Sequence, residues 1–337
     1  ILGRMPRTQF VVRYDFRAPG ASPAQRQELY GRSLEQAAYA DEAGFDALML
    51  SEHHASDDGY LPSPVPVAAA MAAVTERLPI TISALLVNFY DPLRLAEELA
   101  VLDHLSKGRV SHTIGLGYRR EEYALFDRPW STRGADLEAR IQTLLAAWTG
   151  EELTYEGRRV RVLPTPYSQP HPVLFYGGGT VAAARRAGRL GLHFQPQHGD
   201  PVLKDAYEQA CREAGRAPGF TLLAPPGPAN VFCSEDPAVF WERHGHHLLA
   251  DATAYQEWHG DAASYVVDTS RTVEEMQAAG VYVVLEPDDL VERCRSGEIA
   301  LVTAHPACGG LPAEPSWESL RLIGDRVMPA LASRDGR

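Results

Sequence analysis

The side chains best suited to chemistry near neutral pH are two adjacent histidines, His53 and His54, which follow Ser51 and Glu52 after a short apolar run. An imidazole titrates close to pH 7, so a histidine placed here would serve as a general acid or base. Side chains alternate in direction along an extended segment, and we therefore expect only one of the two to face a site. The alternative for either histidine, taken singly, is a structural role with its hydrogen bonds satisfied.

A metal ion is the second chemistry that these histidines suggest. Neighbouring residues on a strand cannot both ligate one ion easily, and no H-x-H or H-E-x-x-H spacing accompanies them. The run His244-Gly245-His246-His247 also has no spaced cysteine or carboxylate partner, and we expect it to lie on a solvated or lid-like face. The sequence therefore predicts no metal site.

Three consecutive glycines, Gly177, Gly178 and Gly179, precede Thr180 at the junction of a predicted strand and a predicted helix. Glycine allows close approach of a ligand to the backbone, and a helix N-terminus attracts anions, so we expect a cofactor phosphate here. Thr180 would cap the helix or donate its hydroxyl group to the phosphate. The alternative is a plain tight turn. A G-x-G-x-x-A dinucleotide pattern ending at Ala182 also matches, but the following strand does not end in the required acidic residue.

These segments must be positioned by a series of alternating strands and helices. The sequence predicts eight strands, over residues 9–14, 47–50, 80–87, 110–116, 172–176, 192–195, 230–233 and 299–303. Helical sequence follows most of them, over residues 23–43, 65–77, 91–105, 180–189, 201–214 and 316–331. This alternation predicts an α/β fold, a closed (β/α)8 TIM barrel with its active site at the C-terminal ends of the strands.

Two stretches exceed the minimal repeat and are expected to be insertions after strands four and seven. Residues 151–169 contain a hairpin-like turn at Tyr155-Glu156-Gly157-Arg158, and residues 234–280 form a long, mainly helical excursion. Long connections of this kind are usually lids or binding surfaces, and we expect the excursion to cover the substrate. We find no linker, so residues 5–331 are predicted to form a single domain.

Composition restricts the partners and the location of the chain. It has 337 residues and a formal net charge of -12, without a basic run, which argues against nucleic acid or an anionic membrane as a partner. Its four scattered cysteines indicate reduced thiols and not a disulfide framework. No apolar run reaches the roughly 18 residues that span a bilayer, and we expect a cytoplasmic protein.

With these motifs in place, the sequence resembles the bacterial-luciferase-like flavin monooxygenase family. The resemblance rests on Ser51-Glu52-His53-His54, on the block from Leu102 to Arg109, on Gly115-Leu116-Gly117-Tyr118, on residues 177–191, and on the C-terminal stretch from His305 to Pro329. It covers most of the chain, and residues 234–280 match poorly.

The resemblance implies roles for individual residues. The family's catalytic histidine corresponds to His53, and its non-prolyl cis peptide beneath the flavin ring would be Ser83-Ala84. The cofactor phosphate would lie on Gly178, Gly179 and Thr180.

We place Glu52, Tyr118 and Gly177 at the same cofactor site, with Glu52 and His54 also supporting His53. In luciferase itself an arginine after strand four helps to hold the phosphate, but Leu116 stands there in this chain. Arg119 and Arg185 are the candidates to replace it.

The resemblance also implies the reaction and the partners. Reduced FMN, supplied by a separate flavin reductase, would react with O2 and a small organic substrate, and the chain would form a homodimer through its second and third helices. One alternative keeps the fold and transfers hydride with the deazaflavin coenzyme F-420. Another is a flavin-binding partner subunit or storage protein without catalysis. An unrelated aldolase or hydrolase barrel is disfavoured, because no strand ends in lysine and no G-x-S-x-G motif occurs.

Overall fold

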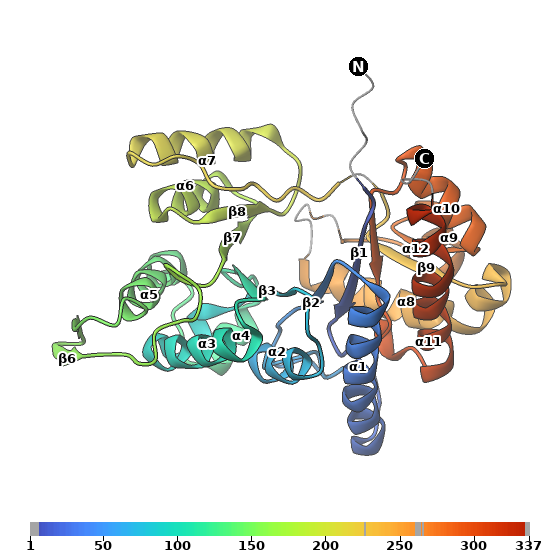
Figure 1. Cartoon of the computed structure of the whole chain (residues 1–337), viewed down its shortest axis with the longest axis horizontal. Coiled ribbons are helices and arrows are strands. Elements are labelled where there is room, and N and C mark those ends of the chain that lie inside the picture. The colour runs from blue at the N-terminus through green and yellow to red at the C-terminus, as the bar shows by residue number, and fades with distance from the viewer. Residues whose placement is uncertain (1–6, 226, 260–263, 265, 334–337) are drawn as a thin grey trace.

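A computed structural model describes residues 7–225, 227–259, 264 and 266–333 of the chain. Its main sheet has seven parallel strands in the order β11-β1-β2-β3-β4-β7-β8. Figure 1 labels β1, β2, β3, β7 and β8 of this sheet. Buried apolar runs without a polar face favour such a parallel sheet, because helices cover it. The strands are β1 (Gln9–Tyr14), β2 (Ala47–Leu50), β3 (Ile80–Leu85), β4 (Val110–Ile114), β7 (Leu174–Gly178), β8 (His193–Pro196) and β11 (Leu301–Ala304).

The sheet is not closed, and the predicted closed barrel is therefore wrong in this respect. The predicted seventh strand exists as β9 (Asn230–Cys233), but it pairs in parallel with β10 (Tyr282–Leu285), which sequence analysis missed. β9 and β10 form a separate two-stranded sheet, and the described part of the chain shows neither of them paired with the edge strands β8 and β11. The result is a parallel half-barrel with a small second sheet, whose strand β9 packs beside β11.

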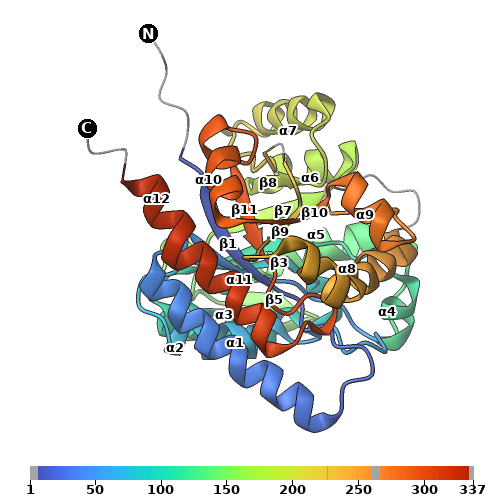
Figure 2. The same cartoon turned by 90° about the vertical axis from the view of Figure 1, so that its right-hand side faces the viewer.

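Helices cover the sheet in chain order. The pairs α1–α2, α2–α3, α3–α5, α5–α6 and α6–α7 are in contact, and α11 packs against α1 (Figure 2). The bounds are α1 (Pro23–Ala43), α2 (Pro64–Ala73), α3 (Pro92–Ser106), α4 (Arg120–Leu125), α5 (Arg133–Ala147), α6 (Val181–Leu190), α7 (Pro201–Glu213), α8 (Pro237–His259), α9 (Val273–Ala279), α10 (Pro287–Ser296), α11 (Ala313–Leu322) and α12 (Met328–Ala332).

Several predicted boundaries shift for local reasons. β3 ends at Leu85, because residues 87–89 form a turn of 3-10 helix. β7 continues through Gly178, so two of the three glycines belong to a strand and not to a loop. The start of α1 follows the predicted signal, since Ser22 and Gln25 form a reciprocal capping box ahead of Pro23.

Both stretches that exceed the repeat have regular structure. Residues Leu153–Tyr155 and Arg158–Val160 pair as an antiparallel hairpin, β5 and β6, around the predicted turn. The excursion forms α8 and α9, which enclose a separate apolar cluster with β9 and β10.

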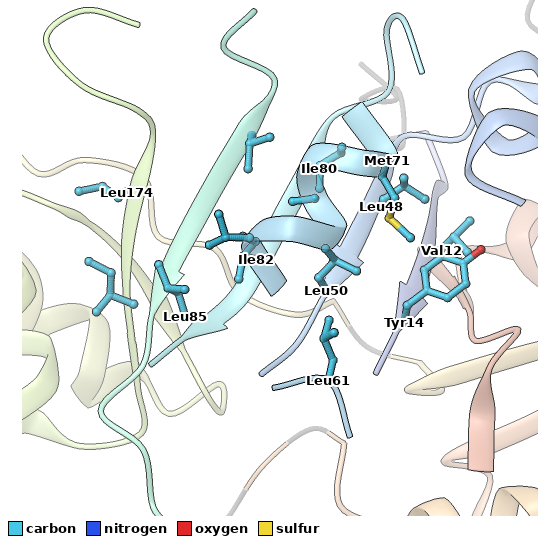
Figure 3. Close-up of a cluster of buried hydrophobic side chains, with 14 of the residues drawn as sticks. Val12, Tyr14, Leu48, Leu50, Leu61, Met71, Ile80, Ile82, Leu85 and Leu174 are labelled. Carbon is cyan, nitrogen blue, oxygen red and sulfur yellow. The ribbon is translucent and has the colours of Figure 1, made fainter. Parts of the chain in front are cut away.

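The main core lies between the sheet and its helices. Figure 3 shows side chains from β1, β2 and β3, including Leu48, Leu50, Ile80 and Ile82, none of which is measurably exposed to solvent. This continuous apolar contact fixes the strands, and their C-terminal ends consequently share one edge. No helix in the described part of the chain is long and apolar enough to cross a membrane.

Candidate active site

The centre of the candidate site is a chain of three side chains from three segments. His53, just after β2, has Nδ1 2.8 Å from Glu122 Oε1 on α4, and its Nε2 lies 2.9 Å from the hydroxyl of Tyr118. Tyr118 follows β4 after Gly117, whose φ of 77° is in the region that favours glycine. The three residues form the order carboxylate, imidazole, phenol, in which a proton can pass between the phenol and the imidazole.

The surroundings define the protonation of this chain. Glu122 Oε1 also accepts the backbone N–H of His54 at 2.9 Å, so it acts as an acceptor and His53 Nδ1 is assigned the proton. Burial lowers the pKa of His53, with Arg119 and Arg17 acting in the same direction and Glu122 opposing them. Burial raises the pKa of Tyr118. At neutral pH the chain therefore holds a neutral imidazole and a protonated phenol.

His54 lies in different surroundings from His53, although both are buried. Its Nε2 is 2.9 Å from Glu52 Oε1, which also accepts the hydroxyl of Tyr90 at 2.8 Å. Glu52 Oε2 accepts the backbone N–H of Leu86 at 2.8 Å. Glu52 thus ties the end of β2 to the end of β3, and this restrains the segment that carries His53.

An indole between two guanidinium groups covers His53. Trp258, in the last turn of α8, has Arg17 on one side and Arg119 on another, each with its Cζ 4.1 Å from the ring centroid. The rings of Trp258 and His53 are 4.9 Å apart, and Tyr60 lies beside both. The excursion therefore contributes a side chain directly to the site.

Arg119 is held at this end of the site. Its Nη1 donates to the carbonyl of His54 at 2.6 Å and lies 3.5 Å from Glu122. Arg185, the other candidate to replace the arginine of luciferase, is an exposed residue on α6.

The glycine segment lies at the same edge of the sheet, beyond β4. Thr180 caps α6 by accepting the N–H of Ala183 at 3.2 Å, so of its two predicted roles the capping one is observed. A Cβ atom on Gly178 would come within 2.6 Å of the Ala183 side chain, which accounts for glycine at this position. Helix geometry leaves the amides of Val181 and Ala182 without intrahelical acceptors, and such amides bind anions.

Polar side chains join β3 and β4 to β8 along this edge. The predicted cis peptide between Ser83 and Ala84 is present at the end of β3. Thr113 on β4 donates to Gln195 Oε1 on β8 at 2.5 Å, and Ser83 Oγ lies 3.5 Å from the same oxygen. The ends of β2, β3, β4 and β7 are neighbours in the sheet, so the predicted residues from Glu52 to Thr180 border one continuous edge.

Sequence reasoning missed several residues of this site. Glu122 escaped because α4 was not predicted and because 69 positions separate it from His53. Arg17 and Trp258 escaped because their contacts depend on how α8 folds over the sheet. The pattern of aromatic residues in the excursion was the only signal of this contact, and it is a weak one.

The histidine run on α8 differs from a uniformly solvated face. His246 is exposed, whereas His244 and His247 are half-buried, and His247 Nδ1 lies 2.9 Å from the carbonyl of Gly309. This contact joins α8 to the segment after β11.

The luciferase-like monooxygenase family model matches residues 9–296. The chain belongs to the luciferase-like monooxygenase family. The predicted family is therefore confirmed, and its members are oxidoreductases.

Individual relatives differ in cofactor and in coverage. An F420-dependent glucose-6-phosphate dehydrogenase of Microbacterium testaceum is 28% identical over 320 residues, covering 89% of this chain and 93% of the relative. An uncharacterized protein of Sinorhizobium fredii, y4wF, is 33% identical over 170 residues, and the match spans about half of each chain (49%).

Among solved structures, the oxygenating constituent of 3,6-diketocamphane monooxygenase from Pseudomonas putida, a type II Baeyer-Villiger monooxygenase in complex with FMN, has the same fold. Its TM-score is 0.69 at 19% identity, and the match covers 96% of this chain and 99% of that one.

Proposed function

We propose that this protein is the oxygenating component of a two-component, FMN-dependent monooxygenase acting on a small organic substrate. The observation that carries the proposal is the Glu122–His53–Tyr118 chain, with Glu122 and His53 buried and Tyr118 half-buried, covered by Trp258 on the same sheet edge as the capped glycine segment. A separate reductase would supply the reduced FMN. His53 is the proposed catalytic residue.

The residues at this edge fit a flavin mononucleotide. The first-turn amides of α6, with Gly177, Gly178, Gly179 and Thr180, would hold the phosphate by backbone hydrogen bonds and helix polarity. Glu122 Oε2 is a buried oxygen without a hydrogen-bond partner in the described part of the chain, as expected where a bound molecule supplies a donor.

Glu52, Ser83, Ala84 and Tyr118 would border the ring system between the phosphate end and His53. They lie at or near the ends of β2, β3 and β4, and of these strands β3 and β4 lie between His53 and the glycine segment. When bound, reduced FMN supplies the activation of molecular oxygen.

Tyr118 and His53 would transfer one proton during the reaction. As Tyr118 Oη accepts a proton from a hydroxyl group of the substrate, its own proton passes to His53 Nε2. Glu122 stabilises the imidazolium ion that results, and the reverse transfer returns the proton to the product. Positioned acid-base groups of this kind contribute about 100- to 10,000-fold to rates.

The cover over His53 would keep water away from this exchange. Trp258 and Tyr60 pack edge-on against the imidazole at centroid distances of 4.9 Å. Exclusion of water strengthens the hydrogen bonds within the chain and prevents side reactions of activated oxygen.

Anaerobic titrations would test the cofactor. Reduced FMN, reduced riboflavin and reduced coenzyme F-420 would each be added to the protein while binding is measured by fluorescence or calorimetry. We expect FMN to bind at least about 10-fold more tightly than riboflavin, because only FMN carries the phosphate. Equal affinity for FMN and riboflavin would contradict the phosphate site, and binding of F-420 alone would contradict the proposed cofactor.

The second candidate is a deazaflavin-dependent dehydrogenase. It is supported by the F420-dependent relative that matches over 89% of this chain. In that reaction Tyr118 and His53 would take the hydroxyl proton of an alcohol. The carbon that bears this hydroxyl group would lose its hydride to the deazaflavin. Oxygen consumption coupled to product formation supports the monooxygenase, whereas turnover under strict anaerobiosis with oxidised F-420 supports the dehydrogenase.

A further inference from the structure

A second cluster of reactive side chains lies beneath α8, near the C-terminal ends of β1 and β11. Asp251 on α8, His305 directly after β11, and Cys308 in the next turn offer ligand atoms that all lie within 4.8 Å of one another. All three residues are buried, with exposures of 0%, 1% and 0%. None of them belongs to the proton-transfer chain.

The donor atoms of this cluster are incompletely satisfied by the protein. His305 Nδ1 is buried without a hydrogen-bond partner in the described part of the chain. His305 Nε2 lies 3.3 Å from Asp15 Oδ1, and Asp251 Oδ1 lies 3.3 Å from Arg17 Nε, so these two atoms have only ionic contacts with the protein. The other oxygen, Asp251 Oδ2, accepts the hydroxyl of Tyr282 at 2.6 Å, which holds the carboxylate in place. Buried polar atoms without partners are rare in proteins and usually mark a bound species.

The charged groups around the cluster have a net negative charge, which favours binding of a cation. Asp15, Asp58 and Asp251 surround the guanidinium groups of Arg13 and Arg17, with contacts between 2.5 and 3.7 Å, so three carboxylates face two cations. One negative charge is therefore in excess when His305 and the thiol are neutral. A divalent ion bound to a Cys308 thiolate would bring the whole group to neutrality. A protonated His305 would do the same without a metal, and this is the rival state.

We propose that Asp251, His305 and Cys308 bind a divalent transition-metal ion, with Zn²⁺ as the best match. One thiolate, one imidazole and one carboxylate are the ligand types that zinc takes in proteins, usually with a coordination number of four. Asp15 Oδ1 lies 3.3 Å from His305 Nε2 and accepts the backbone N–H of Arg17 at 3.1 Å, so a water molecule would complete the coordination.

A surface cleft borders the segments that carry two of the proposed ligands, although none of the three ligands lines it. A cleft of about 590 Å³ on the outer surface is lined by Ala250 and Gly309, which are chain neighbours of Asp251 and Cys308. His246 and His247 line the same cleft. A bound ion would join α8 to the segment after β11, and so would stabilise the helix that carries Trp258 over His53.

The test begins with the untagged wild-type protein, stripped with a chelator and then exposed to Zn²⁺ or Co²⁺. After gel filtration we expect about one ion per chain by mass spectrometry. The cobalt form should show a thiolate-to-metal charge-transfer band, and X-ray absorption of the zinc form should show a single sulfur ligand at about 2.3 Å. The melting temperature should rise on loading, since the ion binds only the folded chain.

Variants then assign the ligands. Cys308→Ala should abolish the charge-transfer band and reduce the ion content to near zero. Cys294→Ala, which removes another buried thiol, and His246→Asn, which removes an exposed imidazole of the cleft, should keep both. If Cys308→Ala does not fold, His305→Gln takes its place, and the cobalt spectrum of the wild type decides thiolate ligation without any variant.

Three results would overturn the proposal. The first is a wild-type protein that retains no ion after gel filtration, which leaves a protonated His305 as the neutralising charge. The second is an ion without sulfur ligation, or one kept in Cys308→Ala. The third is an ion lost in His246→Asn, which would identify adventitious binding on the surface of α8.

Discussion

At the scale of single residues, Glu122 determines what His53 can do. A carboxylate on Nδ1 fixes the tautomer, leaves Nε2 to accept a proton and stabilises the imidazolium ion that follows. The substitution Glu122→Gln keeps the shape and removes the charge. We expect kcat to fall about 100-fold with little change in KM, because the lost interaction acts mainly when the imidazole is charged.

The pH dependence separates this effect from a structural one. His53 must be neutral to accept a proton, so activity falls as the pH drops through its pKa, which lies below the ordinary value. Glu122 raises that pKa against the effect of burial, and Glu122→Gln should therefore move the acid limb of the kcat profile to lower pH. The control is Glu121→Gln, a substitution at the exposed neighbouring carboxylate, which should leave the acid limb unchanged. An unchanged acid limb in Glu122→Gln would show that Glu122 does not act through His53.

Sequence reasoning could select His53 as a candidate because its residue type and its place after a predicted strand were both informative. It could not pair His53 with Glu122, since nothing in the local pattern links positions 69 residues apart. The same holds for Asp251 with His305 and Cys308, because their convergence requires α8 to fold back over β11. Only the short interval between His305 and Cys308 resembles metal-ligand spacing.

At the scale of elements, helix starts were more predictable than strand partners. Proline and capping residues act locally, so Ser22 with Pro23 and Asp91 with Pro92 mark helix starts from sequence alone. The pairing of β9 with β10 joins Asn230 to Tyr282 across a long stretch of sequence, and sequence alternation cannot show which strands pair. The closed barrel was predicted for that reason, although β9 itself was placed correctly.

The strand β4 carries a buried histidine, His112, whose titration should be visible in protein stability. Burial lowers its pKa from 6.5 to about 4 in the folded chain. The unfolded chain therefore protonates His112 near pH 6.5, whereas the folded chain does so only near pH 4. The free energy of unfolding consequently falls as the pH drops from about 6.5 to about 4. The loss attributable to His112 should approach roughly 3 kcal/mol.

Urea denaturation of wild type and His112→Gln between pH 7 and about pH 4 would measure this contribution. The variant should have lower stability at pH 7 and a flatter pH dependence, so that the two curves converge in acid. Exposed His104→Gln serves as the control and should follow the wild type. Parallel curves for wild type and His112→Gln would show that His112 is not the titrating group.

At the scale of the whole molecule, the half-barrel places the proposed catalytic and cofactor-binding residues on one edge and leaves most of the helices as its outer surface. α8 is the exception, because it crosses to that edge and contacts both His53, through Trp258, and the segment after β11, through His247. This single helix thus links the candidate active site to the proposed metal site, and stabilising its position affects both.

The helical outer surface contains a shallow apolar cleft between α2 and α3. It is lined by Val65, Ala69, Val101 and Leu105, with Arg94, Glu97 and Glu98 among the other lining residues. Val101 and Leu105 are 47% and 59% exposed, which is a large exposure for aliphatic side chains on adjoining turns. Charges of both signs beside an apolar centre suit a self-complementary contact, in which the same patch meets itself across a two-fold axis.

We therefore expect a homodimer through α2 and α3, as the family resemblance also implies. Light scattering after gel filtration should give about twice the chain mass of 37.0 kDa for the wild type. Leu105→Glu should give a monomer, since it buries a charge in the apolar centre of the interface, where an unpaired charge is costly. Leu125→Glu, at a comparably exposed leucine on α4, should remain dimeric. A monomeric wild type at micromolar concentration, or a dimeric Leu105→Glu, would exclude this surface as the interface.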